Sequence, residues 1–474
     1  MSSLHDHNVC AHKDLTSSPS GYAEQVGYVR PSAEQRARAA GLKRGQQVAE
    51  GSFPAPLVLP NDDLDLDPKW PPQNVRSWVR GKERNEVTDD RRTLYIAPPP
   101  RIDSEVKHMQ SWSIPCRASD DDSKTRISSP NAHDVAQYLQ AFFCGMQVNL
   151  LEPSVVPLNF MRWQDDKRRS KKRKRSDEVP SIALANATEA VRIRSRRCPD
   201  GAFLQQLNLN DLLDAVISNL PADAYSLLML MEQDMYEEED DDYCCGRAYG
   251  GSRCAVVSMA RYNPTTLASN ISTLTFSHLW PASHCADNVN GLVIEALSEK
   301  GGKGKRQLRD DRQTSHGGKT LTLVDLTSSS PPPAEPASTT PQFESAMVEA
   351  VRRWAANPNT TQESRWLSHI CRTASHELGH CFGIDHCVYY ACNMQGTSSI
   401  AEDRRQPPYL CPVDAEKVKR AIAGKEKENG RWQTDQYQAL LRFCKDRMDK
   451  DEGDLWAGLA GWLESRLKEC REDL

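Results

Sequence analysis

The pattern of apolar residues predicts amphipathic helices over most of the C-terminal third of the chain. Apolar side chains recur three and four positions apart in these segments, as they do on the buried face of a helix. The predicted helices cover Phe343 to Ala355, Trp366 to Phe382, Ala415 to Ala423, Trp432 to Arg447 and Leu455 to Leu467. We expect the last of them, which carries Leu459 and Trp462 on its apolar face, to pack onto the rest of the domain.

Short apolar runs earlier in the chain predict buried strands. These runs are Thr93 to Ala97, Val148 to Leu151, Val156 to Phe160, Leu227 to Met231 and Ala255 to Met259. His133 to Phe143 and Asn208 to Leu220 have helical spacing instead, and Gly145 can end the first of these helices. Strands followed by a run of helices predict the α+β fold class.

Composition and charge narrow the class of protein only slightly. The 474 residues carry a net charge of −5, from 60 basic and 65 acidic residues. This balance gives no reason to expect nucleic acid or an anionic membrane as a partner. Met1 to Ser20 has no basic flank and no apolar core of a signal peptide, and no apolar run approaches the ~20 residues that span a bilayer. We therefore expect the protein in the cytoplasm and/or the nucleus. We also expect a monomer.

The 15 cysteines are expected to be reduced thiols, since their number is odd and no signal peptide is visible. The run from Lys167 to Arg175 is the densest charge cluster in the chain. It has two interpretations, a nuclear-localisation signal or a solvated loop whose charges only repel one another.

The chemistry of the chain is concentrated in His376-Glu377-Leu378-Gly379-His380, a sequence typical of a zinc-binding helix. Two histidines four residues apart project from one face of a helix, so both imidazoles can reach a single metal ion. Glu377 follows the first histidine, where its carboxylate can accept a proton from a water molecule beside the metal. His376 and His380 are thus the predicted ligands, and Glu377 is the predicted general base.

A third zinc ligand is expected at His386. Gly383 can turn the chain sharply out of the helix, because glycine adopts unusual backbone angles at little steric cost. Three protein ligands would leave the fourth position of zinc open, which is the arrangement of catalytic zinc sites.

The extended motif resembles the metzincins, whose zinc site rests on a turn that contains a methionine; here the candidate is Met394. Cys387, Cys392 and Cys411 follow at the spacing of one metzincin family, the archaemetzincins. The resemblance implies a metallopeptidase with a mixed twisted sheet, an active-site helix and C-terminal helices. It also implies peptide or protein substrates and two zinc ions, the second held by four cysteines.

This chain departs from the family pattern at the last of those positions, where Asp414 replaces the expected cysteine. A carboxylate oxygen can ligate zinc, although thiolates dominate structural sites. Three arrangements are open: zinc held by the three cysteines and Asp414, zinc with water or Cys381 as the fourth ligand, and an empty site. We favour the first.

A weaker resemblance lies upstream, where Asp234-Met235-Tyr236, Gly246-Arg247-Ala248 and Ala260-Arg261-Tyr262 surround the run from Cys254 to Met259. In metzincins an edge strand aligns the peptide by backbone pairing. Cys254 to Met259 is either that edge strand or an ordinary core strand. The candidates for stabilising an oxyanion are Tyr236, Tyr262, Tyr389 and Tyr390.

These features divide the chain into five parts. We expect a flexible segment at 1–52, the first part of the catalytic domain at 53–297 with a basic insertion at about 164–178, and a disordered insertion at 298–340. The zinc-binding part follows at 341–447 and a C-terminal helix at 448–474. The alternative function, from another class, is a catalytically silent interaction protein that zinc stabilises.

Overall fold

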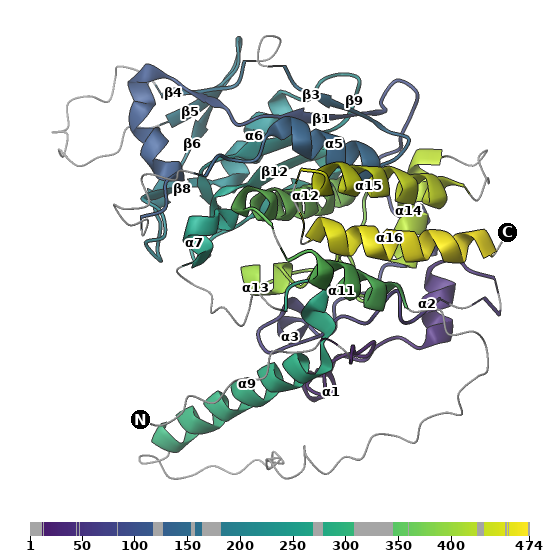
Figure 1. The fold of residues 1–474 in the computed structure, drawn as a ribbon. Coiled ribbons are helices and arrows are strands. Elements are labelled where there is room, and N and C mark those ends of the chain that lie inside the picture. The colour runs from purple at the N-terminus through teal and green to yellow at the C-terminus, as the bar shows by residue number, and fades with distance from the viewer. Residues whose placement is uncertain are drawn as a thin grey trace.

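The apolar run around Leu227 forms the central strand of a five-stranded sheet (Figure 1). In the computed structural model its order is β11 (Gly246–Tyr249), β12 (Cys254–Ser258), β9 (Ala224–Met231), β1 (Thr93–Ala97) and β3 (Gln147–Leu150). The last four strands are parallel to one another, and β11 pairs antiparallel with β12 at the edge. This mixed sheet, surrounded by helices, confirms the α+β class. It also decides that Cys254–Ser258 is a core strand and that the edge strand is β11.

The structure describes all residues other than 1–11, 13, 44, 47, 83, 117–126, 153–156, 164–181, 269–277, 308–344, 359, 424–430, 451–452, 454 and 473–474. The basic run at 167–175 and the later part of the predicted insertion at 298–340 lie outside the described residues. A nuclear role for the basic run therefore stays a prediction from the sequence.

Both faces of the sheet are covered, because side chains of a strand alternate between its two sides. Leu227 and Met229 pack in the cluster around α6 (Leu209–Ser218). Leu228 and Leu230 face the opposite cluster, which contains α12 (Gln362–Cys381) and α5 (Ala132–Phe142). A strand buried on both sides explains why the run is continuously apolar.

Two smaller sheets extend this first part of the fold. One has the order β10 (Asp234–Tyr236), β8 (Gln205–Asn208) and β7 (Ser195–Arg197). The other has the order β2 (Arg101–Ile102), β4 (Asn159–Arg162), β5 (Ile182–Ala185) and β6 (Ala190–Ile193). Some of these strands are not predicted by the apolar pattern, since β6 has a single buried residue and β7 has none.

The C-terminal helices contribute to the same apolar core as the zinc helix α12. They are α11 (Ala346–Ala356), α14 (Pro412–Ala423), α15 (Trp432–Met448) and α16 (Leu455–Glu472), with the short α13 (Ile400–Asp403) between them. Trp462 of α16 is fully buried; its ring stacks on Tyr409 at a centroid distance of 4.0 Å and its indole Nε1 donates to the carbonyl oxygen of Ser52 at 3.0 Å. Helix α16 is therefore part of the core and not an appendage.

The N-terminal segment is the main correction to the predicted organisation. The expected flexible stretch at 1–52 contains α1 (Ala23–Val26) and α2 (Ala33–Ala39), and α3 (Asp63–Leu66) and α4 (Val75–Arg80) follow it. Ser32 and Gln35 form a reciprocal capping box at the start of α2. Tyr28 is buried and donates a hydrogen bond to the carbonyl oxygen of Val388 at 2.8 Å. The segment was misread because its buried residues are too widely spaced to give a periodic pattern.

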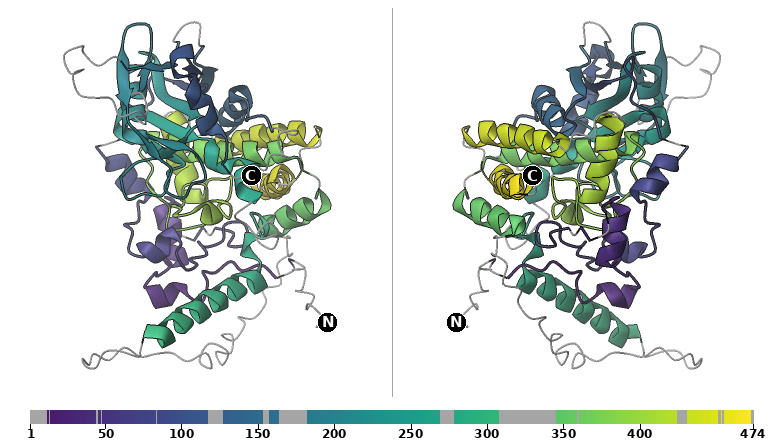
Figure 2. Two further views of the ribbon diagram at one scale, coloured as in Figure 1. Left: turned by 90° about the vertical axis from the view of Figure 1, so that its left-hand side faces the viewer. Right: turned by 90° about the vertical axis from the view of Figure 1, so that its right-hand side faces the viewer.

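Two further expectations need correction. Helix α9 (Ala286–Gln307) continues ten residues into the segment 298–340 that composition predicts to be disordered. It lies at the far end of the molecule from the sheets (Figures 1 and 2).

Among the described cysteines, thirteen are free thiols as expected, but Cys285 is disulfide-bonded. The remaining described helix, α7 (Pro264–Ala268), follows the strand block.

No helix in the described part of the chain is both long enough and apolar enough to cross a membrane.

Replacement of Trp462 by alanine should destabilise the fold. The loss of a fully buried indole should lower the free energy of unfolding by about 3–5 kcal/mol. Val348→Ala on α11, where the side chain is 39% exposed, serves as the control and should change it by less than about 0.5 kcal/mol. Urea denaturation followed by circular dichroism measures both, and equal losses would show that α16 does not belong to the cooperative core.

Candidate metallopeptidase site

The three motif histidines converge in the structure. His376 and His380 lie one turn apart on α12, with their Nε2 atoms 3.1 Å apart. The ring of His386 returns to within 5.4 Å of the first ring and 5.1 Å of the second, measured between centroids. Gly383, between helix and third histidine, has a φ of +73°, in the left-handed region that favours glycine. Imidazole nitrogens of a tetrahedral zinc lie ~3.3 Å apart, so the donor set fits the metal.

Backbone carbonyls orient two of the rings. The Nδ1 atom of His376 lies 2.7 Å from the carbonyl oxygen of Asn393, and that of His380 lies 2.7 Å from the carbonyl oxygen of Ile384. These contacts leave Nε2 of each ring directed to the shared centre. Burial lowers the pKa of all three histidines to about 3, so the rings are neutral near pH 7, the form that binds metal.

The third ring has different neighbours. His386 Nδ1 is buried and has no hydrogen-bond partner among the described residues. A Cβ atom on Gly396 would lie 2.7 Å from this nitrogen and 2.2 Å from a carboxylate oxygen of Asp63. The Asp63 carboxylate and the imidazole therefore border the same small space, which a side chain at position 396 would fill. Trp70 lies beside the ring, at a centroid distance of 5.4 Å.

Met394 lies directly against the zinc helix. A Cβ atom on Gly379 would lie 2.3 Å from the Met394 sulfur, so the glycine inside the motif is required for the close approach of the turn. The carbonyl oxygen of Met394 accepts a hydrogen bond from the backbone N–H of Cys387 at 2.7 Å. The turn that holds Met394 is thus fixed to both ends of the histidine cluster.

Glu377 is buried beside the edge strand. A Cβ atom on Gly246 of β11 would lie 2.9 Å from Glu377 Oε1, which shows how closely the strand backbone approaches the carboxylate. Burial raises the pKa of Glu377 to about 8, against the lowering effect of the Arg247 guanidinium.

These groups line a cleft of about 560 Å³. Its walls are the edge strand β11, the zinc helix and the loop around Ser398, and Trp70 and Gln73, between α3 and α4, close it on another side. Among the four tyrosines proposed from the sequence, only Tyr262 lines the cleft; Tyr243, which was not proposed, lines it too. Trp70 and Gln73 were missed because no local motif marks them.

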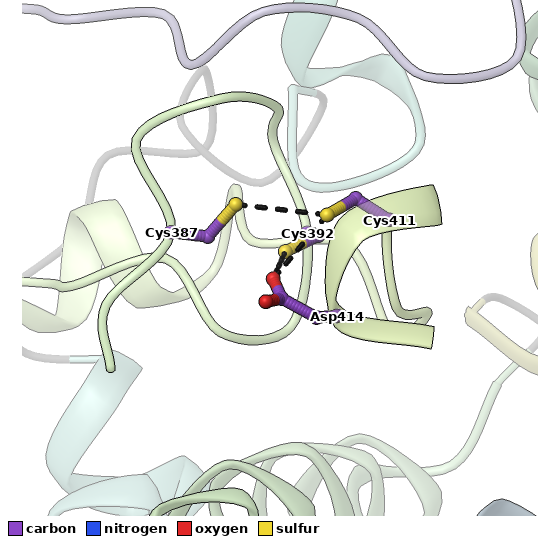
Figure 3. Close-up of side chains that lie close together, drawn as sticks. All are labelled: Cys387, Cys392, Cys411 and Asp414. Carbon is purple, nitrogen blue, oxygen red and sulfur yellow. Dashed lines mark hydrogen bonds between the residues drawn. The ribbon is translucent and has the colours of Figure 1, made fainter. Parts of the chain in front are cut away.

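The three cysteines and Asp414 form a second cluster, with their side chains pointing to one place (Figure 3). The sulfur atoms of Cys387 and Cys411 are 3.6 Å apart. Asp414 Oδ2 lies 3.4 Å from the Cys392 sulfur and 3.2 Å from that of Cys411. A tetrahedral zinc separates two thiolates by ~3.8 Å and a thiolate from a carboxylate oxygen by ~3.5 Å, so the four donors fit the metal. Cys381 is not part of this cluster.

The second oxygen of Asp414 is engaged by a lysine. Lys417, only 2% exposed, donates to Asp414 Oδ1 at 2.8 Å. Burial and the neighbouring Cys387 raise the pKa of Asp414 to about 6 and outweigh the opposing effect of Lys417. The carboxylate therefore presents one oxygen to the cysteines and the other to a buried cation.

Gln73 connects the two clusters. Its Oε1 accepts from Lys417 Nζ at 2.9 Å and from the backbone N–H of Asp385 at 3.1 Å. Its Nε2 donates to the carbonyl oxygen of Gly383 at 3.0 Å. Gln73 thus holds both the turn between His380 and His386 and Lys417 of the cysteine cluster.

Comparison with known proteins gives a partial but specific match. Residues 349–420 match the sequence model of Peptidase family M54. An archaemetzincin-2 from Pongo abelii is 37% identical over 87 residues, which are 18% of this chain and 22% of the relative. The human archaemetzincin-1 is 22% identical over 300 residues, 63% of this chain and 41% of the relative. The chain thus matches about a fifth of the length of the archaemetzincin-2 relatives.

Solved structures give a weaker likeness. The archaemetzincin of Methanopyrus kandleri covers 71% of this chain and 98% of its own, at 13% identity and a TM-score of 0.30. This TM-score is too low to support an inference. Residues 349–420, which carry the histidine and cysteine motifs, are thus similar to the archaemetzincins of Peptidase family M54.

Proposed function

We propose that this protein is a zinc-dependent metallopeptidase that hydrolyses peptide bonds in peptides or proteins. The observation that supports this most directly is the placement of Glu377 beside three converged neutral imidazoles, in a cleft bordered by an edge strand. A purely structural zinc site has no need of a buried carboxylate next to its ligands.

His376, His380 and His386 would hold the catalytic zinc. When bound there, the ion supplies Lewis-acid polarisation of a peptide carbonyl and of a water molecule. Glu377 accepts the proton of that water and returns it to the leaving amine. Burial raises its pKa to about 8, which suits a carboxylate that must both take and release a proton near neutrality.

The edge strand β11 is the proposed binding site for the peptide backbone. An extended peptide can add to a sheet edge by main-chain hydrogen bonds. Gly246 lies on this strand against Glu377, so a peptide paired with β11 would run past the general base.

We further propose that Cys387, Cys392, Cys411 and Asp414 hold a second zinc ion that does not touch substrate. The support is the fit of their spacing to tetrahedral coordination and the position of Lys417, which engages the other oxygen of Asp414. Cys387 follows His386 directly, so this ion would fix the chain where it leaves the catalytic site.

Glu377→Gln should retain zinc but lose hydrolysis. The amide cannot accept a proton, so kcat/KM on a peptide library should fall at least about 100-fold, while zinc content stays that of the wild type. Equal cleavage by the two proteins would contradict the general-base role. Zinc binding without cleavage by the wild type would favour the silent interaction protein.

Gly246→Ala should reduce activity by displacing the Glu377 carboxylate, which lies 2.9 Å from the position of the new methyl group. We expect kcat to fall about 10–100-fold with bound zinc unchanged. Gly251→Ala is the matched control, because Gly251 lines the same cleft but a Cβ there would meet nothing within 4 Å. Equal kcat values of Gly246→Ala and Gly251→Ala would show that β11 does not position Glu377.

Asp414→Ala should lower zinc content from about two ions per chain towards one, because a ligand and the partner of buried Lys417 are both lost. Asp414→Cys should keep the second ion, since thiolate is the softer ligand. Asp214→Ala, at an exposed position of α6, is the control. A wild-type content of one zinc, unchanged by Cys392→Ser, would show that the second site is empty.

A further inference from the structure

A third group of metal-binding side chains lies apart from both clusters described above. The ligand atoms of His12, His278 and Cys285 all lie within 4.8 Å of one another. None of these residues belongs to the zinc motif, the cysteine motif or the cleft. The three side chains come from the start of the N-terminal segment and from the stretch that leads into α9.

Backbone pairing brings these distant parts of the chain together. Leu15 and Cys285 form an isolated antiparallel bridge. The N–H of Thr16 donates to the carbonyl oxygen of His284 at 2.9 Å. The N–H of Ala286 donates to the carbonyl oxygen of Asp14 at 2.8 Å. His12 therefore lies near Cys285 because the flanking backbone is held in register.

The two histidines meet at an angle. Their ring centroids are 5.1 Å apart, with an interplanar angle of 78°, and the ring of His12 also meets Trp354 of α11 edge-on at 5.4 Å. His12 Nδ1 is buried and has no hydrogen-bond partner among the described residues. A buried ring nitrogen without a hydrogen-bond partner is costly unless a ligand occupies the space beside it.

The donor types point to one class of ligand. Two imidazoles and one thiolate suit zinc and similar borderline cations, which bind nitrogen and sulfur at about 2.0–2.3 Å. Calcium and magnesium prefer oxygen donors, and this group contains none.

The oxidation state of Cys285 decides whether the group can bind metal. Cys285 is disulfide-bonded in the structure, and a disulfide sulfur does not replace a thiolate as a zinc ligand. A dithiol reductant would transfer two electrons to the bond: the S–S bond breaks, two cysteine thiols form, and the reductant becomes a disulfide. Zinc can then displace the proton of the Cys285 thiol.

We propose that His12, His278 and reduced Cys285 bind a zinc-class cation, and that oxidation of Cys285 releases it. The bound ion would fasten the start of the N-terminal segment to the base of α9. Trp70 and Gln73, further along the chain, line the proposed catalytic cleft, so a bound ion would hold the part of the chain that leads to that wall.

Zinc content of the purified full chain tests the proposal. Under a thiol reductant, wild type should hold about one zinc ion more per chain than His12→Ala or His278→Ala. A matched control is His108→Ala. His108 is exposed and its ring also meets a tryptophan edge-on, at a centroid distance of 5.4 Å. It belongs to none of the groups of potential metal ligands among the described residues. Each variant is first checked by circular dichroism for wild-type helix content. Oxidation by diamide should abolish the difference between wild type and His12→Ala, whatever happens at the other sites.

A second measurement needs no substitution. In the reduced wild type, added zinc should slow alkylation of Cys285 by iodoacetamide at least about tenfold, read by mass spectrometry of the peptide that contains it. Equal zinc contents of wild type and both histidine variants, or an alkylation rate of Cys285 that zinc does not change, would overturn the proposal. Both readings are independent of peptidase activity, so a silent Glu377 site would leave them unaffected.

Discussion

The close contact between Gly379 and Met394 is the constraint on which the rest of the site depends. The zinc helix can approach the following turn only because position 379 has no side chain, and a methyl group there would overlap the Met394 sulfur. This approach brings the carbonyl oxygen of Asn393 to His376, and the carbonyl oxygen of Met394 accepts a hydrogen bond from the N–H of Cys387, the residue after the third histidine. The packing of one glycine against one methionine thus holds the turn against the histidine cluster.

The replacement of a cysteine by Asp414 is balanced by its surroundings. A buried carboxylate is unfavourable unless it is paired, and Lys417 supplies the pairing from the next turn of α14. The lysine is itself held by Gln73, which also holds the backbone on either side of Ile384. A change at Asp414 is therefore connected to the turn between His380 and His386 through the side chains of Lys417 and Gln73.

The part of the chain before β1 contributes to the site as much as the histidine motif does. Trp78 donates from its indole to the carbonyl oxygen of Phe382 at 2.9 Å, and the N–H of Ala391 donates to that of Pro54 at 2.9 Å. Together with Tyr28 on Val388, these bonds follow the chain around the turn that contains His386 and Cys387. This part lies outside the residues that match the family model.

The sequence by itself determined the parts whose chemistry is local. His376, His380 and Glu377 share one helix, so their relative positions follow from its period, and the apolar runs marked β1, β9 and the C-terminal helices to within a few residues. Only the tertiary structure decided that β11 is the edge strand, that Gly246 adjoins Glu377, and that Lys417 and Gln73 join the two clusters. These contacts link residues up to 344 positions apart, and a pattern along the chain carries no information about such distances. The same reason explains the N-terminal segment: its polar composition predicts flexibility, whereas its stability comes from hydrogen bonds to a turn that is remote in sequence.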